Sequence, residues 1–174
     1  PICYNHTKPI KIYKEMILMN IFIYDLCFEK NAQMHCDRHV VKMITEYNQI
    51  LSTVCWMNGE TAPYKPTHQH HPSVKWCSES KHNYEFLVSL NKALCKEYTY
   101  RYGKIHAGEI VLMQLDNTYP NLPDRGVTPF ALTMPDIYKH KNPVTAYRAY
   151  FNGEKLHLAK WKNRNIPDWV KKGW

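Results

Sequence analysis

One feature of the sequence constrains the fold more than any other: an apolar stripe at helical spacing between residues 40 and 54. Its members recur three or four residues apart, the period of one face of an α-helix. They are Val40, Val41, Ile44, Tyr47, Ile50, Leu51 and Val54. The stripe predicts a long amphipathic helix from Asn31 to about Trp56, and the following Asn58-Gly59 pair is typical of a helix C-terminus.

The other segments also favour helices. A second long helix is expected from Pro72 or Ser73 to about Tyr102, after a loop over 59–72 that holds three prolines and three histidines. A third is expected over 105–115, and a last one begins at Pro143 and runs through Trp161. Four prolines between residues 116 and 135 predict a long irregular connection.

The N-terminal residues are predicted to be different. The apolar, β-branched and aromatic run Met19–Tyr24 predicts a short strand or hairpin. Residues 1–18 show no helical face and are expected to form an arm. The predicted fold is therefore mainly α: one compact helical bundle over 19–174 with a short N-terminal strand or hairpin and long Pro-rich connections.

Charge is concentrated near the C-terminus. The formal net charge is +8, and residues 139–174 carry nine Lys/Arg and two acids, against fourteen and thirteen in residues 1–138. Such a basic segment suits a phosphate-bearing partner, and Lys160, Lys162 and Arg164 are the candidate phosphate contacts. The alternative is a solvated basic tail without a specific partner.

Cysteine and hydropathy patterns bear on the compartment. The six cysteines form no CxxC pair, which indicates reduced thiols in an intracellular protein. No apolar run approaches the ~18 residues of a membrane span, and no small-residue cleavage site follows the apolar stretch at 17–26. We therefore expect no membrane partner.

The first predicted helix carries a polar line on one face. His35, His39, Lys42 and Glu46 are spaced by four, three and four residues, and Arg38 flanks them. Arg38 and Lys42 are candidate phosphate contacts. Histidine, cation and carboxylate on one face are what proton transfer on an anionic substrate requires. Lys42 is expected to keep Glu46 ionised, and the role of His39 is expected to depend on protonation between about pH 5 and 8. The alternative is the solvated face of an ordinary helix.

A histidine-rich loop precedes the second helix. His68, His70 and His71 could join His35 and His39 in a zinc site, but HExxH is absent and the Lys42 cation would repel a divalent metal. We therefore predict no bound metal and no cofactor. The alternative for His68 or His70 is a hydrogen-bonded cap of the second helix. His35, His39, His71 and Glu46 are the candidate catalytic residues, and together with Arg101 they are predicted to converge on one pocket.

Two further groups mix cations with aromatic residues. Arg101 and Lys104 lie among tyrosines at the end of the second helix, where they could clamp a phosphate and stack on a base. If Glu97 and Arg101 were only a surface ion pair, they would contribute just ~0.3–0.5 kcal/mol. Arg148 and Lys155 lie seven residues apart on one face of the last helix and are further candidates for phosphate contact.

Several chemistries lack their motifs. The sequence contains neither GxxxxGK[ST] nor GxGxxG, so nucleotide binding by those two routes is disfavoured. The GxSxG elbow of hydrolases and the zinc-deaminase signature are also absent.

The polar motifs together resemble a known protein family. They occupy 32–43, 64–68 with His71-Pro72 and Trp76, 97–104, 134–136 and 146–155. This set resembles a family of small proteins encoded mainly by tailed phages and other large DNA viruses. The resemblance covers about 19–169 and implies a viral protein acting in the cytoplasm of the infected host cell.

A weaker likeness is to phage pyrimidine-dimer DNA glycosylases, which are small, basic, helical proteins. Their pattern of a free N-terminal amine with a carboxylate and arginines from an early helix implies comparable roles for Glu46, Arg38 and His35. The eighteen residues before Met19 depart from that pattern, because they would move the amine away from the site.

The sequence thus predicts a viral enzyme acting on DNA or a nucleotide, with chemistry at a nucleobase or its glycosidic bond. Basic residues would neutralise phosphates, aromatic residues would hold an extruded base, and Glu46 with a histidine would handle the proton or the cationic sugar. One alternative is a base- or nucleotide-modifying transferase. The other is a non-catalytic viral protein that binds nucleic acid or a host protein.

Overall fold

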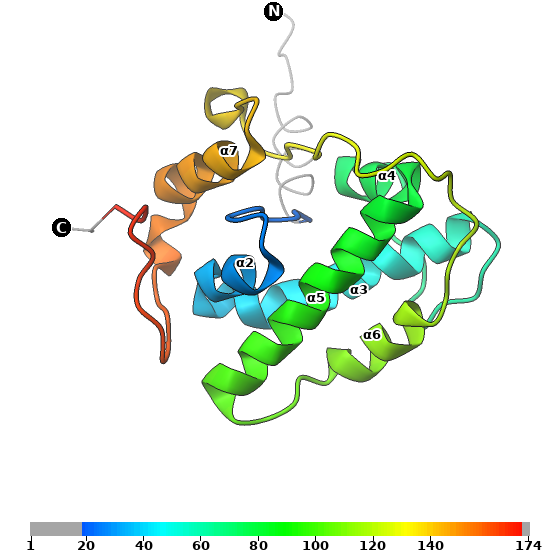
Figure 1. Cartoon of the computed structure of the whole chain (residues 1–174), viewed down its shortest axis with the longest axis horizontal. Coiled ribbons are helices and arrows are strands. Elements are labelled where there is room, and N and C mark those ends of the chain that lie inside the picture. Colours follow the sequence, from blue (N-terminus) through cyan, green and yellow to red (C-terminus); the bar gives the residue numbers. More distant parts are fainter. Residues whose placement is uncertain (1–18, 172–174) are drawn as a thin grey trace, which may run out of the picture.

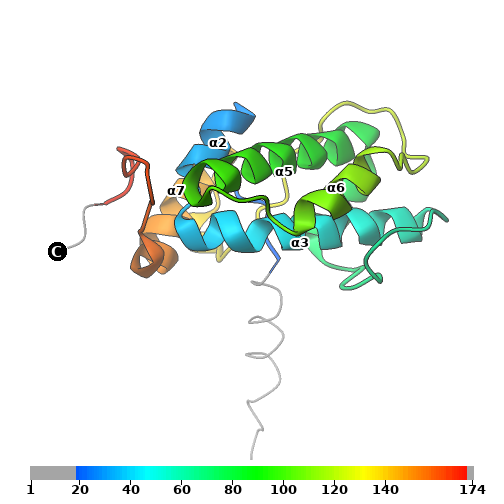
Figure 2. The same ribbon diagram turned by 90° about the horizontal axis from the view of Figure 1, so that it is seen from below.

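Two long helices form the centre of the molecule. The structure, a computed structural model, describes residues 19–171. In it α3 (Asp37–Met57) and α5 (Lys81–Tyr102) pack against each other and run in opposite directions (Figure 1). Figure 2 shows α5 and α3 as two stacked layers, with α2 and α6 on either side of α5. The prediction of a mainly helical domain is confirmed. The other elements are α2 (Phe28–Met34), α4 (Pro72–Glu79), α6 (Gly108–Asp116), η1 (Asp136–Tyr138), α7 (Pro143–Tyr150), η2 (Phe151–Lys155) and η3 (Leu156–Leu158).

The first long helix that the sequence predicted is two helices. α2 ends at Met34 and α3 begins at Asp37, because His35 and Cys36 both adopt extended backbone angles. At this break the Asp37 N–H donates to the carbonyl of Lys160, over a distance of 2.8 Å. The C-terminal segment therefore takes the hydrogen bond that a continuous helix would have made. The predicted stripe is buried as expected, except for Val41.

The second predicted helix is also divided, at Ser80. Its backbone is extended (φ −152°), and its hydroxyl accepts a hydrogen bond from the His82 N–H at 3.1 Å, which makes it the N-cap of α5. Pro72 is the first residue of α4. The backbone N–H of a residue at this position has no partner within the helix, so the missing N–H of proline costs nothing here. Gly103 ends α5 in a left-handed conformation (φ +65°), as predicted.

The run Met19–Tyr24 is extended, but it forms no strand with any part of the described chain, so the strand prediction is wrong. Hydrogen bonds to side chains take the place of the backbone hydrogen bonds that a neighbouring strand would make. The Tyr24 N–H donates to Asn31 Oδ1 at 3.0 Å, Asn31 Nδ2 donates to the Phe22 carbonyl at 3.2 Å, and the Phe22 N–H donates to the Tyr47 hydroxyl at 3.2 Å. These bonds satisfy the buried backbone, which must be paired in any conformation.

The last third of the chain wraps round the central helices. Residues 117–135 form no helix, as predicted, and run past α4 towards η1 and α7 (Figure 1). The predicted helix through Trp161 is shorter: α7 ends at Tyr150, then widens into the π-helix η2 and tightens into η3. Gly153 of η2 packs against the ring of Tyr138, which would have to move to make room for a Cβ atom at this position.

Some predictions concern the outside of this fold. Among residues 19–171, no helix is both long and apolar enough to cross a membrane. The five cysteines in this range are free thiols: Cys27, Cys36, Cys55, Cys77 and Cys95. Cys3 and the predicted arm over 1–18 lie outside the described residues.

Candidate functional site

A cluster of titratable side chains lies at the start of α3. We call it the α3 cluster and define it as His35, His39, Lys42, Glu46 and Lys155. The rings of His35 and His39 have centroids 6.3 Å apart, and Lys42 Nζ lies 2.6 Å from Glu46 Oε1. Lys155 comes from η2 and interacts electrostatically with Lys42, Glu46 and His39. Four of the five residues therefore form the polar line predicted from the sequence, and the fifth approaches it from the other end of the chain.

Three polar atoms of the α3 cluster are buried without a hydrogen-bond partner among the described residues. They are His35 Nε2, His39 Nδ1 and Glu46 Oε2. His35 Nδ1 lies 2.8 Å from the carbonyl of Asn31, which can only accept, so Nδ1 carries the proton and Nε2 offers a lone pair. An unsatisfied buried group costs about 1–3 kcal/mol, so folded proteins keep few of them. These three atoms are therefore able to form a hydrogen bond with a bound molecule.

Aromatic rings form one wall of the α3 cluster. Phe22 stacks on His39 with ring centroids 4.3 Å apart and an interplanar angle of 19°. Lys155 Nζ lies 5.0 Å from the centroid of the Tyr150 ring and 6.0 Å from that of Phe22. The extended segment that the sequence analysis assigned to a strand thus supplies an aromatic surface against a histidine and a lysine. The aromatic residues within 19–24 are the feature of the sequence from which this wall could have been predicted.

Both histidines of the α3 cluster are held neutral. Burial lowers the pKa of His35 to about 4. Burial also lowers the pKa of His39 well below its usual range, and the nearby cations Lys155, Lys42 and Arg38 add to this shift. The prediction that His39 changes protonation between about pH 5 and 8 is therefore wrong. These imidazoles act as neutral donors and acceptors.

The carboxyl and amine groups of the α3 cluster are both shifted towards their neutral forms. Burial raises the pKa of Glu46, although the hydrogen bond and charge of Lys42 and the charge of Lys155 oppose the shift. This corrects the prediction that Lys42 simply keeps Glu46 ionised. Burial lowers the pKa of Lys155, and repulsion from Lys42 lowers it further. Neighbouring groups perturbed in this way are typical of sites that transfer protons.

Arg101 belongs to a different arrangement, a buried ion network. Its Nε lies 2.7 Å from Glu97 Oε1, its Nη1 lies 2.9 Å from Asp37 Oδ1, and its Nη2 donates to the Gln33 carbonyl at 3.0 Å. Arg164 completes the network with a contact of 2.9 Å to Glu97 Oε2. Arg101 is 1% exposed and its donors are occupied, so its predicted roles in phosphate contact and in the pocket are wrong. It joins α5 to α3 and α2.

Two other predicted residues are also structural. His71 is the N-cap of α4, where its Nδ1 accepts from the Ser73 N–H at 3.1 Å; the sequence analysis had considered His68 or His70 for that role. Its convergence with His39 stays a prediction. Arg148 donates from Nη2 to the Tyr24 carbonyl at 2.7 Å and lies 5.5 Å from the centroid of the Trp169 ring. It fastens α7 to the N-terminal segment.

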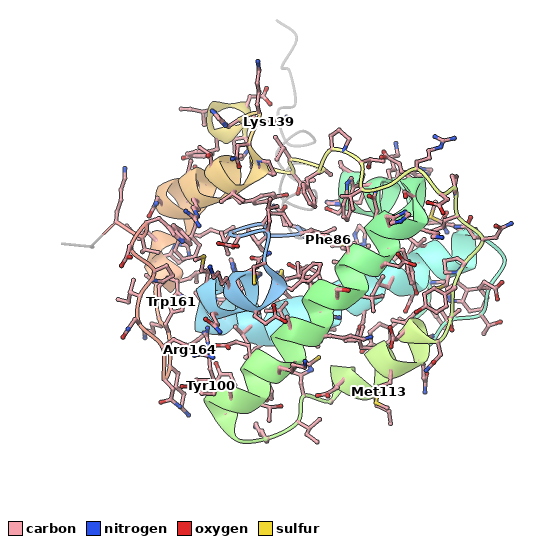
Figure 3. All side chains as sticks on the ribbon, in the orientation of Figure 1. Phe86, Tyr100, Met113, Lys139, Trp161 and Arg164 are labelled. Atoms are coloured by element: carbon pink, nitrogen blue, oxygen red, sulfur yellow. The ribbon has the colours of Figure 1, made fainter. Side chains whose placement is uncertain are left out.

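The remaining predicted cations are accessible. Arg38, Lys42, Lys104, Lys160 and Lys162 are exposed. The Arg164 guanidinium lies 3.8 Å from the centroid of the Tyr100 ring, and Figure 3 shows the pair at the end of α5. Both line a groove of about 680 Å³ that also includes Lys30, Ile166 and Asp168. Two donors of Arg164, Nε and Nη2, are already bonded to Glu97, so the rest of its guanidinium and the exposed Tyr100 ring are what the groove offers to a phosphate or a base.

No group of three or more His, Cys, Asp or Glu side chains within residues 19–171 has a metal-binding arrangement. The absence of zinc stays a prediction, to be tested on the purified protein.

Comparisons of the chain with protein-family models, with curated proteins and with solved structures found no match. The geometry of the α3 cluster and the chemistry of its residues are therefore the basis for proposing a function.

Proposed function

We propose that this protein acts on DNA or a nucleotide, and that the α3 cluster carries out chemistry at a nucleobase or its glycosidic bond. The observation that carries the proposal is the pair of buried, unpartnered atoms Glu46 Oε2 and His39 Nδ1 beside two lysines. A carboxyl group with a raised pKa can give a proton to a departing base. Once ionised, the same group stabilises the positive charge that develops on the sugar.

The surroundings support a nucleic-acid substrate. Tyr100, which is exposed and lies beside Arg164, offers a stacking surface at the groove. The basic surplus of residues 139–174 would neutralise phosphates. A base must leave the duplex stack before chemistry can occur on it, and stacking surfaces lower the cost of that step.

The test is incubation of the purified protein with labelled duplexes that carry unmodified, damaged or hypermodified bases, followed by chromatography of the products. Release of a free base supports the proposal. Transfer of a group to the base, with the glycosidic bond intact, would identify a modifying transferase. Glu46→Gln should keep binding and lose turnover, whereas Glu60→Gln, at an exposed carboxylate, should behave as the wild type. Turnover that survives Glu46→Gln would contradict the proposal.

A second candidate function is non-catalytic binding of a protein partner. It is favoured by the exposed apolar residues of α6 and the loop before it. Ile105, Ile110 and Met113 are 73%, 66% and 62% exposed, and Figure 3 shows Met113 pointing away from the molecule. For such a binder, Met113→Glu should abolish complex formation and Glu46→Gln should have no effect.

A further inference from the structure

The groove of about 680 Å³ lies where α2, the end of α5 and the C-terminal segment meet. Its volume is in the range of ligand-binding pockets, about 300–1,000 Å³. Figure 3 shows two of its residues, Tyr100 and Arg164, side by side at this end of the molecule. The described residues that line it include no member of the α3 cluster, so the groove is a second candidate site. They are Lys30, Gln33, Met34, Tyr100 and residues 163–168.

The C-terminal wall of the groove is held in place by two acidic residues of the central helices. The Lys162 N–H donates to both carboxylate oxygens of Asp37, at 2.9 and 3.0 Å. Arg164 donates from Nε and Nη2 to the two oxygens of Glu97, at 3.0 and 2.9 Å, and Glu97 is buried. A wall that is already ordered spares a ligand the entropic cost of ordering it. The groove is therefore preformed.

Tyr100 presents an aromatic ring in this groove. It is 55% exposed, although the Arg164 guanidinium lies over the ring at 3.8 Å from its centroid. Arg164 therefore covers one face of the ring and leaves the rest of it open. Its Nη1 makes no hydrogen bond within the described part of the chain, so this donor is available to an anion.

Lysines lie on both sides of the Tyr100 ring. Lys30 lines the groove from α2. Lys96 is exposed and lies one helical turn before Tyr100 on the same face of α5, about 6 Å along the helix axis. It interacts electrostatically with Glu29 of α2. Asp168 is the one acid among the described lining residues. The groove therefore surrounds an exposed ring with an excess of cations.

This combination favours an unpaired nucleotide over other anions. Proteins that bind single strands stack bases on aromatic rings and contact the phosphates with cations. A base inside a duplex is stacked between its neighbours and cannot reach such a ring. An acidic peptide would use the cations, but it would gain no stacking energy from the ring.

We propose that this groove binds an unpaired nucleotide, with the base stacked on Tyr100 and the phosphate held by Lys30 and Arg164. This inference rests on the proposed function, since it takes DNA or a nucleotide as the ligand, and it adds that the ligand is unpaired at this site. A single strand and a free nucleoside monophosphate both present this chemistry.

The test compares a fluorescein-labelled single strand with the same strand annealed to its complement, by fluorescence anisotropy. The single strand should bind more tightly by about 10-fold or more. Tyr100→Leu removes the ring and should weaken single-strand binding by about 5- to 150-fold, the effect of losing one stacked base. Tyr100→Phe keeps the ring and should bind like the wild type. Tyr119→Leu, at an exposed tyrosine outside the groove, is the matched control and should also bind like the wild type.

Salt dependence separates the phosphate contact from the stacking contact. Lys30→Ala should reduce the slope of log affinity against log salt by about 0.7, the value for one phosphate contact on a single strand. Tyr100→Leu should leave the slope unchanged, because stacking releases no counterion. An unchanged slope for Lys30→Ala would overturn the assignment of the phosphate to this lysine.

Competition experiments identify the ligand. Displacement of the strand by a nucleoside monophosphate would support a free nucleotide as the occupant, and resistance to it would support a strand. Equal competition by polyglutamate, no preference for the single strand, or wild-type binding by Tyr100→Leu would overturn this inference and leave the proposed function standing. Failure to bind any of the DNA or nucleotide probes would count against the proposed function and, with it, this inference.

Discussion

Two buried glutamates, Glu46 and Glu97, should respond in opposite ways to the same substitution. Both are largely buried, and methionine matches the length of glutamate and is a good helix former. Glu46 leaves one oxygen without a partner, whereas both oxygens of Glu97 are bonded to arginines. We expect Glu46→Met to stabilise the fold and Glu97→Met to destabilise it, because only the second carboxylate is fully used by the structure.

The magnitudes follow from the contacts. Glu46→Met removes an orphaned oxygen that costs about 1–3 kcal/mol and loses an i,i+4 ion pair worth about 0.3–0.5 kcal/mol, because Lys42 is exposed. The net gain in the free energy of unfolding is about 0.5–2.5 kcal/mol. Glu97→Met leaves the fully buried Arg101 guanidinium with Asp37 as its remaining carboxylate, and breaking a buried pair from one side costs about 3–5 kcal/mol.

The assay is urea denaturation at pH 7, with the slope of the transition checked for constancy. A chain of this size should also shift its melting temperature by about 2–4 °C per kcal/mol. If Glu46→Met lowered stability by more than about 1 kcal/mol, Glu46 would be a structural residue like Glu97, and the reasoning from its unpartnered oxygen would be refuted.

Three further outcomes are expected. The folded chain keeps His35 neutral down to about pH 4, whereas the unfolded chain takes up a proton below about pH 6.5. Stability should therefore fall as the pH is lowered from about 6.5 to 4, by about 3 kcal/mol for this group. His35→Gln, measured by urea denaturation across that range, should flatten the fall, and an unchanged profile would count against it. Lys160→Ala and Lys162→Ala should each weaken DNA binding for all sequences alike and reduce the slope of log affinity against log salt by about 0.9 per lost phosphate contact; a salt-independent affinity would speak against a phosphate surface. Elemental analysis should find no stoichiometric zinc, and activity lost on chelation and restored by zinc would show the opposite.

The sequence predicted the helices well and their breaks poorly. The stripe from Val40 to Val54 locates α3 because burial requires the helical period. The break between α2 and α3 at His35 and Cys36 contains no glycine or proline that would reveal it in the sequence. It is stabilised by a hydrogen bond to the Lys160 carbonyl, which is distant in the sequence. Ser80 did carry a signal, because serine is a preferred N-cap and stands just before α5.

The candidate site was partly predictable for a similar reason. The line of His39, Lys42 and Glu46 follows from helical spacing alone. The different surroundings of the Lys42–Glu46 and Glu97–Arg101 pairs do not follow from spacing, because both are i,i+4 pairs in sequence. Glu97 meets a second arginine 67 residues away, whereas Glu46 meets no second bonded partner among the described residues. Whether a charged pair is structural or available depends on such tertiary neighbours, which spacing does not encode.

A single-turnover experiment tests the central claim, that Glu46 in the α3 cluster carries out chemistry on a bound nucleic acid. With protein in excess over a labelled duplex that the wild type converts, the rate of product formation and the dissociation constant are measured for the wild type and for Glu46→Gln. A lost general acid–base group costs typically about 100- to 10,000-fold in rate. We predict a loss of that size with the dissociation constant changed by less than about threefold, which is under 1 kcal/mol. An unchanged rate, or a loss explained entirely by weaker binding, would contradict the account.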